Sequence, residues 1–434
     1  MSDYKYVSEH NLLGYQRSWN QKPLEWQGNR VIGRTSVGHL RGIDWTRHRE
    51  NRLGRLQAML REQGVSAMLL TMGENVNYAT GTSDYNWKGS NGTLYALMFA
   101  DPDKAPILYE TVGPDTEIVK MHCPWIDANH LRPAITYKMT GSAYKHQLDR
   151  YIQQIKDALV ENGISPTADL AVDSMDFSTY LAFKEAGMNI ISVGDALTEV
   201  RCTKSADEIE LIKVASAITQ AAFWKMKNEW VKPGVTEREV VAKAVEFYIA
   251  NGMTSWGVIV ASGSNTNPLH RMWSDKIIQQ GDMVIIDIGV PSYQGYGIDV
   301  TRCWPVEAPF TPKQKEVYKQ CYNATYAAIN KIKPGNTTAD VAAQFPPDMV
   351  DVHGTCDMLQ VAHSVGMGFY EGYWMNRGFS LDYPMPIKKN MVIACETYVA
   401  SPEGPAARLE DTVVVTDDGY ELLSFVPFEK EALE

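Results

Sequence analysis

In the first half of the chain, some apolar residues recur at helical spacing and others form short runs of strand length. Between residues 45 and 64, apolar side chains recur at helical spacing and stop at Gly64, which predicts an amphipathic helix. Short apolar runs of strand length follow, namely SAMLLTM, LYALMFA, APILYE, ADLAVD and NIISVG. Helical stretches such as YKHQLDRYIQQIKDALVENG separate them. This alternation predicts an α/β domain over residues 46–200.

The pattern changes character near residue 200. Ser205 and Glu208 have the spacing of a capping box ahead of a long helix, which indicates that a second domain begins here and covers residues 201–434. Its expected helices lie at about 205–230, 236–252 and 312–331. Its expected strands are VIVAS, DMVIIDIG, IDVTRCWPV, MVIACETYV, DTVVVT and ELLSF. Residues 1–45 show no sustained period and predict an irregular N-terminal arm.

Composition narrows the class of protein. A chain of 434 residues with 44% hydrophobic content can bury two cores. The net charge of -11 argues against nucleic acid or an anionic membrane as partner, so a small-molecule substrate is expected. The six cysteines include no CxxC pair and predict reduced thiols. Since the N-terminus lacks the apolar core of a signal peptide and no apolar run has the length of a membrane span, we expect a cytoplasmic protein.

Two aspartates stand within strongly apolar runs. Asp287 lies near the end of DMVIIDIG, and Asp299 lies near the start of IDVTRCWPV, with the glycine-rich connection PSYQGYG between them. A hairpin would bring the two carboxylates together. Because an isolated buried carboxylate costs several kcal/mol, each must be paired, hydrogen-bonded or bound to a metal.

The same anomaly recurs further along the chain. Glu396 in VIACETYV and Glu410 in ARLEDTVVV both stand beside runs of strand-forming residues. His363, in QVAHSVGMGF, directly follows an apolar run. Each residue alone is as compatible with a turn cap or a hydrogen-bonded core residue as with a ligand. Together, four carboxylates and one imidazole can hold two divalent ions about 3.5 to 4 Å apart.

These residues resemble the pita-bread family that contains methionine aminopeptidase, prolidase, aminopeptidase P and creatinase. Its metal-binding members share the order Asp, Asp, His, Glu, Glu, and this sequence fills all five positions. SGSNTNPLH, ending at His270, looks like the stretch that supplies a substrate-contacting histidine, and ENVNYATG at 74–81 looks like a family turn. The resemblance implies an α/β (α+β) fold, with a creatinase-like N-terminal α/β domain followed by a catalytic pita-bread domain. It also implies a homodimer, in keeping with relatives of this fold.

Departures from the family pattern leave the reaction open. Peptidases of this family carry a second histidine about seven residues after the metal-binding one, where this sequence has Tyr370. In detail the chain is most similar to the dimethylsulfoniopropionate lyases of this fold, called DddP, which share the interval between the aspartates and the NTNP stretch. Those lyases have acidic residues where this chain has Gly289 and Phe369.

Three functions follow as alternatives. In a hydrolase of a small amide or an Xaa-Pro dipeptide, Glu396 would be general base and then acid, and His270 would stabilise the tetrahedral intermediate. In a lyase, Glu371 is the candidate base for β-elimination to dimethyl sulfide and acrylate. The third alternative is a binding protein that has lost catalysis.

Substrate contacts and the metal can also be proposed from the residues. Tyr370 or Glu371 would hold one end of the substrate, and the loop WMNRGFSLDYPMP offers Trp374, Arg377 and Tyr383, either for recognition or as ordinary covering residues. Two divalent ions are expected as cofactors. The oxygen-rich ligand set favours Mn or Fe over Zn or Co. Alternation along a strand points Cys395 away from the face of the neighbouring glutamate, which indicates a core thiol.

Overall fold

The structure is a computed structural model that describes most of the chain. The described residues are 43–82, 94–110, 119–120, 123–254, 257–345, 359–368, 371–401 and 404–434. The predicted N-terminal arm, residues 1–45, therefore lies almost wholly outside the described residues. The chain divides into two compact units, with the division between Val200 and Arg201.

The first unit is an α/β unit built on one mixed sheet. Its strands are β1 (Ala67–Leu70), β2 (Tyr95–Phe99), β3 (Ile107–Glu110), β4 (Leu131–Pro133), β5 (Asp169–Val172) and β6 (Asn189–Ser192). Its helices are α4 (Trp45–Glu62), α5 (Gly73–Thr80), η2 (Gly141–Ala143), α7 (Tyr144–Glu161), α8 (Phe177–Glu185) and α9 (Gly194–Cys202), the last of which runs across the division. The strand order is β4-β3-β2-β1-β5-β6. All five strands expected from the apolar runs are present.

One expected feature of this unit is wrong. The segment ENVNYATG was expected to be a turn, but residues 73–80 form α5. Gly81 ends that helix with a positive φ of 74°, and its N–H donates to the carbonyl of Asn77. Glycine adopts this left-handed cap without a steric penalty. The glycine that suggested a turn is therefore the cap of a helix.

The second unit carries the expected helices and strands. Its helices are α10 (Ala206–Lys225), η3 (Met226–Trp230), α11 (Glu237–Ala250), η4 (Gly263–Thr266), α12 (Pro312–Ile329), α13 (Thr338–Ala342), α15 (Arg377–Ser380) and α16 (Lys430–Leu433). Its strands are β7 (Met253–Thr254), β8 (Gly257–Ser262), β9 (Met283–Tyr293), β10 (Tyr296–Pro305), β11 (Ala362–Ser364), β12 (Trp374–Met375), β13 (Val392–Ala400), β14 (Ala406–Val415) and β15 (Tyr420–Leu422).

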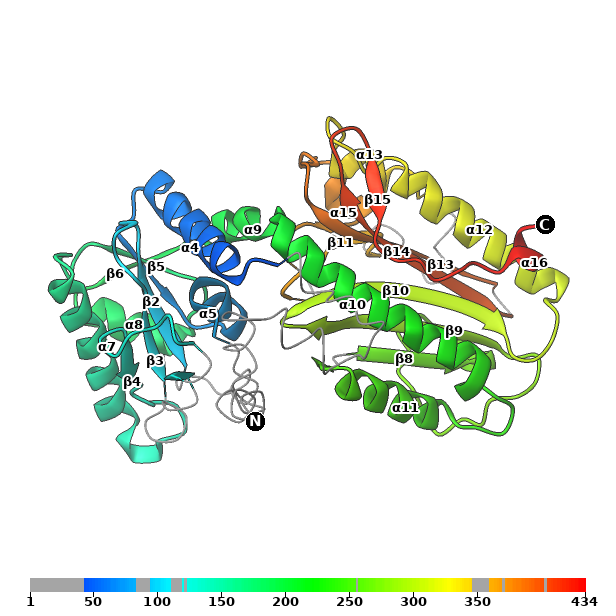
Figure 1. The fold of residues 1–434 in the computed structure, drawn as a ribbon, viewed down its shortest axis with the longest axis horizontal. Helices are drawn as coiled ribbons and strands as arrows, with labels where there is room; N and C mark the ends of the chain where they lie inside the picture. Colours follow the sequence, from blue (N-terminus) through cyan, green and yellow to red (C-terminus); the bar gives the residue numbers. More distant parts are fainter. Residues whose placement is uncertain are drawn as a thin grey trace, which may run out of the picture. The chain divides into compact units, whose positions relative to one another are not determined.

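A single antiparallel sheet organises this unit. The order is β12-β11-β13-β14-β10-β9-β7, with β8 also paired to β9 and β15 to β14. Helices α10 and α11 pack against β8, β9 and β10, whereas α12 packs against β13 and β14 (Figure 1). The two halves of the sheet therefore each have their own helical cover.

Capping boxes begin the main helices of this unit. Ser205 and Glu208 form the predicted box at α10, and Thr236 with Glu239 forms another at α11. Each box satisfies backbone N–H groups that a helix leaves without partners in its first turn. The sequence signal at residue 205 therefore marks the start of the first long helix of the unit.

The hairpin that carries the two aspartates forms as expected, but its strands are longer. β9 continues to Tyr293, so Asp287 stands in the middle of its strand rather than near the end. Gln294 and Gly295 make the turn, both with positive φ, at 53° and 90°. The pairing of β9 with β10 then shifts register between Gly297 and Asp299.

Five of the six cysteines lie in the described residues. Cys123, Cys202, Cys303, Cys321 and Cys395 are free and buried, as the reduced-thiol prediction requires, while Cys356 lies outside the described residues. The thiol of Cys395 is directed to the carbonyl of Thr325 on α12, away from the face of Glu396, as strand alternation predicts.

In the part of the chain that the structure describes, no helix combines the length and apolarity needed to cross a membrane.

Candidate metal centre

Acidic side chains form a row across four neighbouring strands of the second unit. Asp287 on β9 stands opposite Thr301 on β10. Thr301 stands opposite Glu410 on β14, which in turn stands opposite Glu396 on β13. Side chains that face one another in antiparallel strands share one side of the sheet. The register of the sheet therefore gathers residues that are up to 123 positions apart, from 287 to 410, into one line.

Asp299 on β10 and His363 on β11 complete the group. Asp299 precedes Thr301 by two positions and so projects from the same face of β10. The Nε2 atom of His363 lies 3.5 Å from Oδ2 of Asp299 and 3.8 Å from Oε1 of Glu410. One potential ligand atom from each of these three residues lies within 4.8 Å of the others. All three side chains are buried.

The ligand atoms fit a divalent cation. Among the described residues, Oδ1 of Asp299 and Oε1 of Glu410 are buried and make no hydrogen bond. Leaving a buried carboxylate oxygen without a partner costs free energy, and a metal ion removes that cost. Two carboxylates and one imidazole are also ligands that borderline divalent ions accept. The arrangement is therefore that of a metal centre.

Arg408 bridges the two outer members of the acidic row, Asp287 and Glu396. It precedes Glu410 by two positions on β14, and its guanidinium reaches two predicted ligands. Nη1 donates to Oδ2 of Asp287, while Nη2 and Nε donate to Oε2 of Glu396, the last at 2.9 Å. The fork of the guanidinium thus joins the outer members of the row and neutralises part of its negative charge.

Burial and mutual repulsion dominate the electrostatics of the group. Burial, opposed by Arg408, raises the pKa of Asp287 to about 7. Burial and the charge of Asp299 raise the pKa of Glu410 well above its usual value. For Glu396, burial acts in the same direction, but Arg408 and His363 outweigh it and hold its pKa below the usual value. Glu396 is therefore the carboxylate of the row that stays charged most readily.

His363 responds to the same charges. Burial lowers its pKa, but the nearby carboxylates of Asp299 and Glu410 outweigh burial and raise the pKa to about 10. In the absence of a metal, a protonated imidazole would then balance one carboxylate. A divalent ion competes with that proton, since only the neutral ring binds a metal.

His270 stands beside this group on the loop that follows β8. Partial burial lowers the pKa of His270, and the next cause is the nearby charge of Arg408, with Glu396 and Asp299 acting in the opposite direction. Its backbone has a positive φ of 61°, which is uncommon for a residue other than glycine. Strained residues of this kind cluster at functional sites.

Two family models match this chain in tandem. The model described as the creatinase/prolidase N-terminal domain matches residues 52–203, and that of metallopeptidase family M24 matches residues 210–417. The chain belongs to the pita-bread metallopeptidases, family M24. As a member of this family it is a metal-dependent hydrolase, with a creatinase-like domain followed by the M24 domain, as the sequence predicts.

Relatives of this M24 protein match over most of their length. An uncharacterised peptidase of Bacillus subtilis is 28% identical over 87% of this chain and 99% of its own. The Xaa-Pro dipeptidase of Pyrococcus furiosus is 26% identical over 86% of this chain and 98% of its own. The solved structure of the Pyrococcus furiosus prolidase has a TM-score of 0.66 at 25% identity, covering 86% of this chain and 99% of that one.

A further solved structure supports the fold. The dipeptidase of Mycobacterium ulcerans has a TM-score of 0.71 at 24% identity and covers 89% of this chain and 98% of that one. Of these four matches, one is named a peptidase, two are named dipeptidases and one is named a prolidase. They lend no support to the similarity with the DddP lyases, which therefore stays a prediction about this M24 protein.

Glu371, the candidate base of the lyase alternative, stands in a buried network of ion pairs. Its buried carboxylate accepts a hydrogen bond from Nε of Arg201 at 2.8 Å and from the N–H of Met367 at 2.6 Å. Nζ of the fully buried Lys204 lies 3.6 Å from the same carboxylate. The carboxylate of Glu371 is thus paired with two cations. In this M24 protein Glu371 therefore anchors the segment that follows His363.

The predicted substrate contacts fall in different places. Trp374 lies on β12 directly opposite His363 and is 44% exposed, so its indole flanks the ligand group. Arg377 donates to the carbonyl of Phe345 at 2.8 Å. Tyr383 is 73% exposed. Tyr370 lies outside the described residues.

Three residues at the site were missed from the sequence. Arg408 and Thr301 touch the acidic row directly, and Gln360 donates from its side-chain amide to Oε1 of Glu396. A signal existed for Arg408, since an arginine in the apolar strand of AARLEDTVVV is as anomalous as the buried carboxylates. The other two carry no signal in the sequence, because threonine and glutamine are common at such positions.

Proposed function

We propose that this chain is a metal-dependent dipeptidase of the prolidase type, which cleaves the C–N bond of Xaa-Pro dipeptides. The observation that carries the proposal is the buried group of Asp299, His363 and Glu410, with ligand atoms within 4.8 Å of one another. Relatives named Xaa-Pro dipeptidase, which match this chain over nearly their whole length, support the substrate class.

Two divalent ions would be held by five residues of the site. Asp287, Asp299, His363, Glu396 and Glu410 are the ligands in this proposal, and Mn or Fe(II) is the expected metal. When bound, the ions supply a water of lowered pKa and polarise the scissile carbonyl. Oxygen and imidazole ligands from five adjacent strands make the site rigid, because every ligand stands on a paired strand.

Glu396 is the residue proposed to move the proton. Arg408 and His363 outweigh burial and keep its pKa low, so that the carboxylate is charged and can accept a proton from the attacking water. It would then hand the proton to the leaving nitrogen of proline. His270, beside the same row, would donate to the oxygen of the tetrahedral intermediate.

Substrate recognition is proposed to involve Trp374. Its position opposite His363 and its exposure of 44% place an open aromatic surface next to the ligands. A proline ring packs well against such a surface. Tyr370 and Tyr383 remain proposals of the sequence for this role, whereas the bond from Arg377 to the Phe345 carbonyl favours a structural role for that side chain.

The test is proline release by the metal-loaded protein. The protein is reconstituted anaerobically with Mn(II) or Fe(II), its metal content is measured by elemental analysis, and Ala-Pro is compared with Ala-Ala. Metal-dependent release of proline, lost in Asp299→Asn and kept in Asp417→Asn on the exposed turn after β14, supports the proposal. Absence of proline release from fully loaded wild-type protein overturns it.

The same preparations test the alternative reaction. Dimethylsulfoniopropionate is supplied in place of the dipeptide, and acrylate and dimethyl sulfide are measured. Formation of both products by the wild type, without proline release from dipeptides, would replace the dipeptidase by the lyase.

A further inference from the structure

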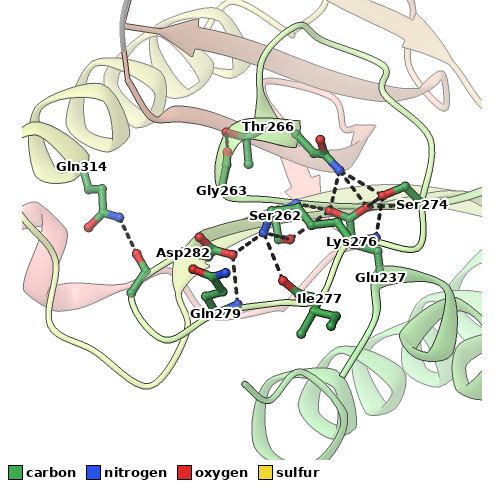
Figure 2. Close-up of polar contacts among 12 residues, drawn as sticks. Glu237, Ser262, Gly263, Thr266, Ser274, Lys276, Ile277, Gln279, Asp282 and Gln314 are labelled. Carbon is green, nitrogen blue, oxygen red and sulfur yellow. Dashed lines mark hydrogen bonds and ion pairs between the residues drawn. The ribbon is translucent and has the colours of Figure 1, made fainter. Parts of the chain in front are cut away.

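Glu237 is a fully buried carboxylate that stands outside the acidic row. It is the first residue of α11 and is 0% exposed. Its Oε1 accepts from the N–H and hydroxyl of Ser262, at 2.7 and 2.9 Å. Its Oε2 accepts from the N–H and hydroxyl of Ser274, at 3.0 and 2.6 Å, and the amide of Asn265 reaches both oxygens at 3.1 Å (Figure 2).

These donors stand at the two ends of one loop. Ser262 is the last residue of β8, and Ser274 follows a segment, residues 263–273, that we call the His270 loop. The backbone of α11 adds to the closure, because the N–H of Arg238 donates to the carbonyl of Ser274 at 3.1 Å. One carboxylate and the first turn of one helix therefore hold both ends of the loop together.

A second set of contacts fixes the start of the same loop. Lys276 donates from Nζ to the hydroxyl of Ser262 at 3.1 Å and to Oδ2 of Asp282 at 2.5 Å (Figure 2). A Cβ on Gly263 would stand 2.4 Å from Oδ1 of Asp282, so the chain passes too close there for any residue but glycine. The hydroxyl of Ser262 thus joins Lys276 to the carboxylate of Glu237.

The middle of the loop is tied to the strand of a predicted ligand. The hydroxyl of Tyr398, two positions after Glu396 on β13, donates to the carbonyl of Thr266 and approaches Oδ1 of Asn267, both at 3.1 Å. His270 follows with its strained φ of 61°. A residue in that conformation keeps it only where the surrounding structure enforces it.

Every group facing the Glu237 carboxylate is a donor. Two are backbone N–H groups, which cannot rotate to become acceptors, and a carboxylate accepts at both oxygens. A glutamine has the same shape but presents one NH₂ group, which would face a donor on whichever side it lay. Glutamate is therefore the side chain that can close both ends of the loop at once.

We propose that Glu237 is a positioning residue, whose carboxylate clamps the two ends of the His270 loop and thereby sets where the His270 ring stands beside the ligand row. The inference rests on the proposed function, in which His270 contacts the substrate. Small displacements of a group that stabilises a transition state cost large factors in rate. Glu237 would then influence the rate without touching substrate or metal.

The experiment compares Glu237→Gln with Glu239→Gln on the same helix. The wild type and both variants are loaded with Mn(II), and metal content and the kinetics of Ala-Pro hydrolysis are measured. Glu237→Gln is expected to lower kcat at least about 10-fold with metal content unchanged. Glu239 is exposed and forms only the capping box of α11, so its variant is expected to keep kcat within about 2-fold.

A double-mutant cycle separates positioning from general destabilisation. In a His270→Ala background the clamp has no ring to position, so adding Glu237→Gln should lower kcat by less than about 2-fold further. If Glu237→Gln costs the same factor with and without His270, or leaves kcat of the wild type unchanged, the inference is overturned. Should Glu237→Gln fail to fold, Ser274→Ala removes one hydroxyl donor and is expected to show the same coupling with a smaller loss.

Amide hydrogen exchange tests the clamp independently of activity. Amides of residues 263–275 should exchange at least about 10-fold faster in Glu237→Gln than in wild type or Glu239→Gln, while those of β9 and β10 stay unchanged. Unchanged exchange in the loop overturns the clamp. If the wild type releases no proline from dipeptides, the proposed function fails, and the exchange result still decides whether Glu237 holds the loop.

Discussion

Two nitrogens of the Arg408 guanidinium donate hydrogen bonds to one carboxylate oxygen of Glu396. Nε donates to Oε2 at 2.9 Å and Nη2 donates to the same oxygen, while Nη1 reaches Asp287. The pair stands inside a group of carboxylates that would otherwise repel one another. A fixed cation at this point neutralises part of their charge and leaves the remaining oxygens of the row for a metal ion.

Replacing Arg408 should lower activity without removing metal. In Arg408→Met the carboxylates keep their attraction for divalent ions, but the cation that helps to hold the pKa of Glu396 low is lost, so kcat/KM should fall about 10² to 10³-fold. Kinetics and elemental analysis of the same samples check this. Arg132→Met, which removes a surface pair with Glu161, is the control expected to behave as wild type. Loss of metal in Arg408→Met would show instead that the arginine holds the ligands in place.

Thr301 should tune metal affinity through Glu410. Its hydroxyl is fully buried and donates to Oε2 of Glu410 at 2.8 Å. In Thr301→Val the carboxylate loses this donor, so metal affinity should fall about 10 to 100-fold, as measured by competition with a fluorescent chelator. Thr325→Val is a matched control, since that buried hydroxyl donates to the Cys321 carbonyl inside α12. Equal affinities in both variants would contradict the role of Thr301.

Glu371 should matter for stability rather than for chemistry. Glu371→Gln breaks buried ion pairs with Arg201 and Lys204 and should lower the free energy of unfolding by about 3–5 kcal/mol, measured by urea titration. Metal-loaded, folded protein should keep kcat within about 3-fold, because a lost general base costs about 10² to 10⁴-fold. A loss of kcat of that size at full metal content would restore Glu371 as a catalytic base.

The metal-free protein should lose stability as the pH rises. Burial raises the pKa of Asp287 to about 7, so the folded state holds a proton more tightly than the unfolded chain does, between about pH 4 and 7. The nearby carboxylates of Asp299 and Glu410 outweigh burial and raise the pKa of His363 to about 10, which extends the decline from about pH 6.5 to 10. In both cases stability falls with increasing pH.

Urea unfolding in the presence of a chelator, at several values between pH 5 and 9, checks that decline. Asp287→Asn cannot release a proton and should show a flatter dependence between pH 5 and 7 than wild type. Saturating metal should raise stability most at high pH, because the ion replaces the bound protons. A metal-free protein that is more stable at pH 8 than at pH 5 would contradict the assignment.

The buried acidic residues could be singled out from the sequence because burial and polarity conflict locally. Asp287, Glu396 and Glu410 stand in runs of strand-forming residues, and an acid in such a run needs a partner wherever the strand is placed. Strand alternation likewise predicted that the buried thiol of Cys395 lies on the face of β13 opposite to Glu396. The capping box at residue 205 was visible because both of its members lie within one helical turn. These features depend on a few neighbouring residues.

The partners of these residues were decided by the fold alone. Arg201 donates to the carboxylate of Glu371 across 170 positions, a pairing that no local pattern predicts. Glu237 meets Ser262 and Ser274 only because α11 packs beside β8. The amino-acid sequence determined that carboxylates and a histidine lie inside apolar strands, since local patterning governs burial. Which of them face a metal, a cation or a loop was decided by sheet register and helix packing, because long-range pairing leaves no periodic trace in the chain.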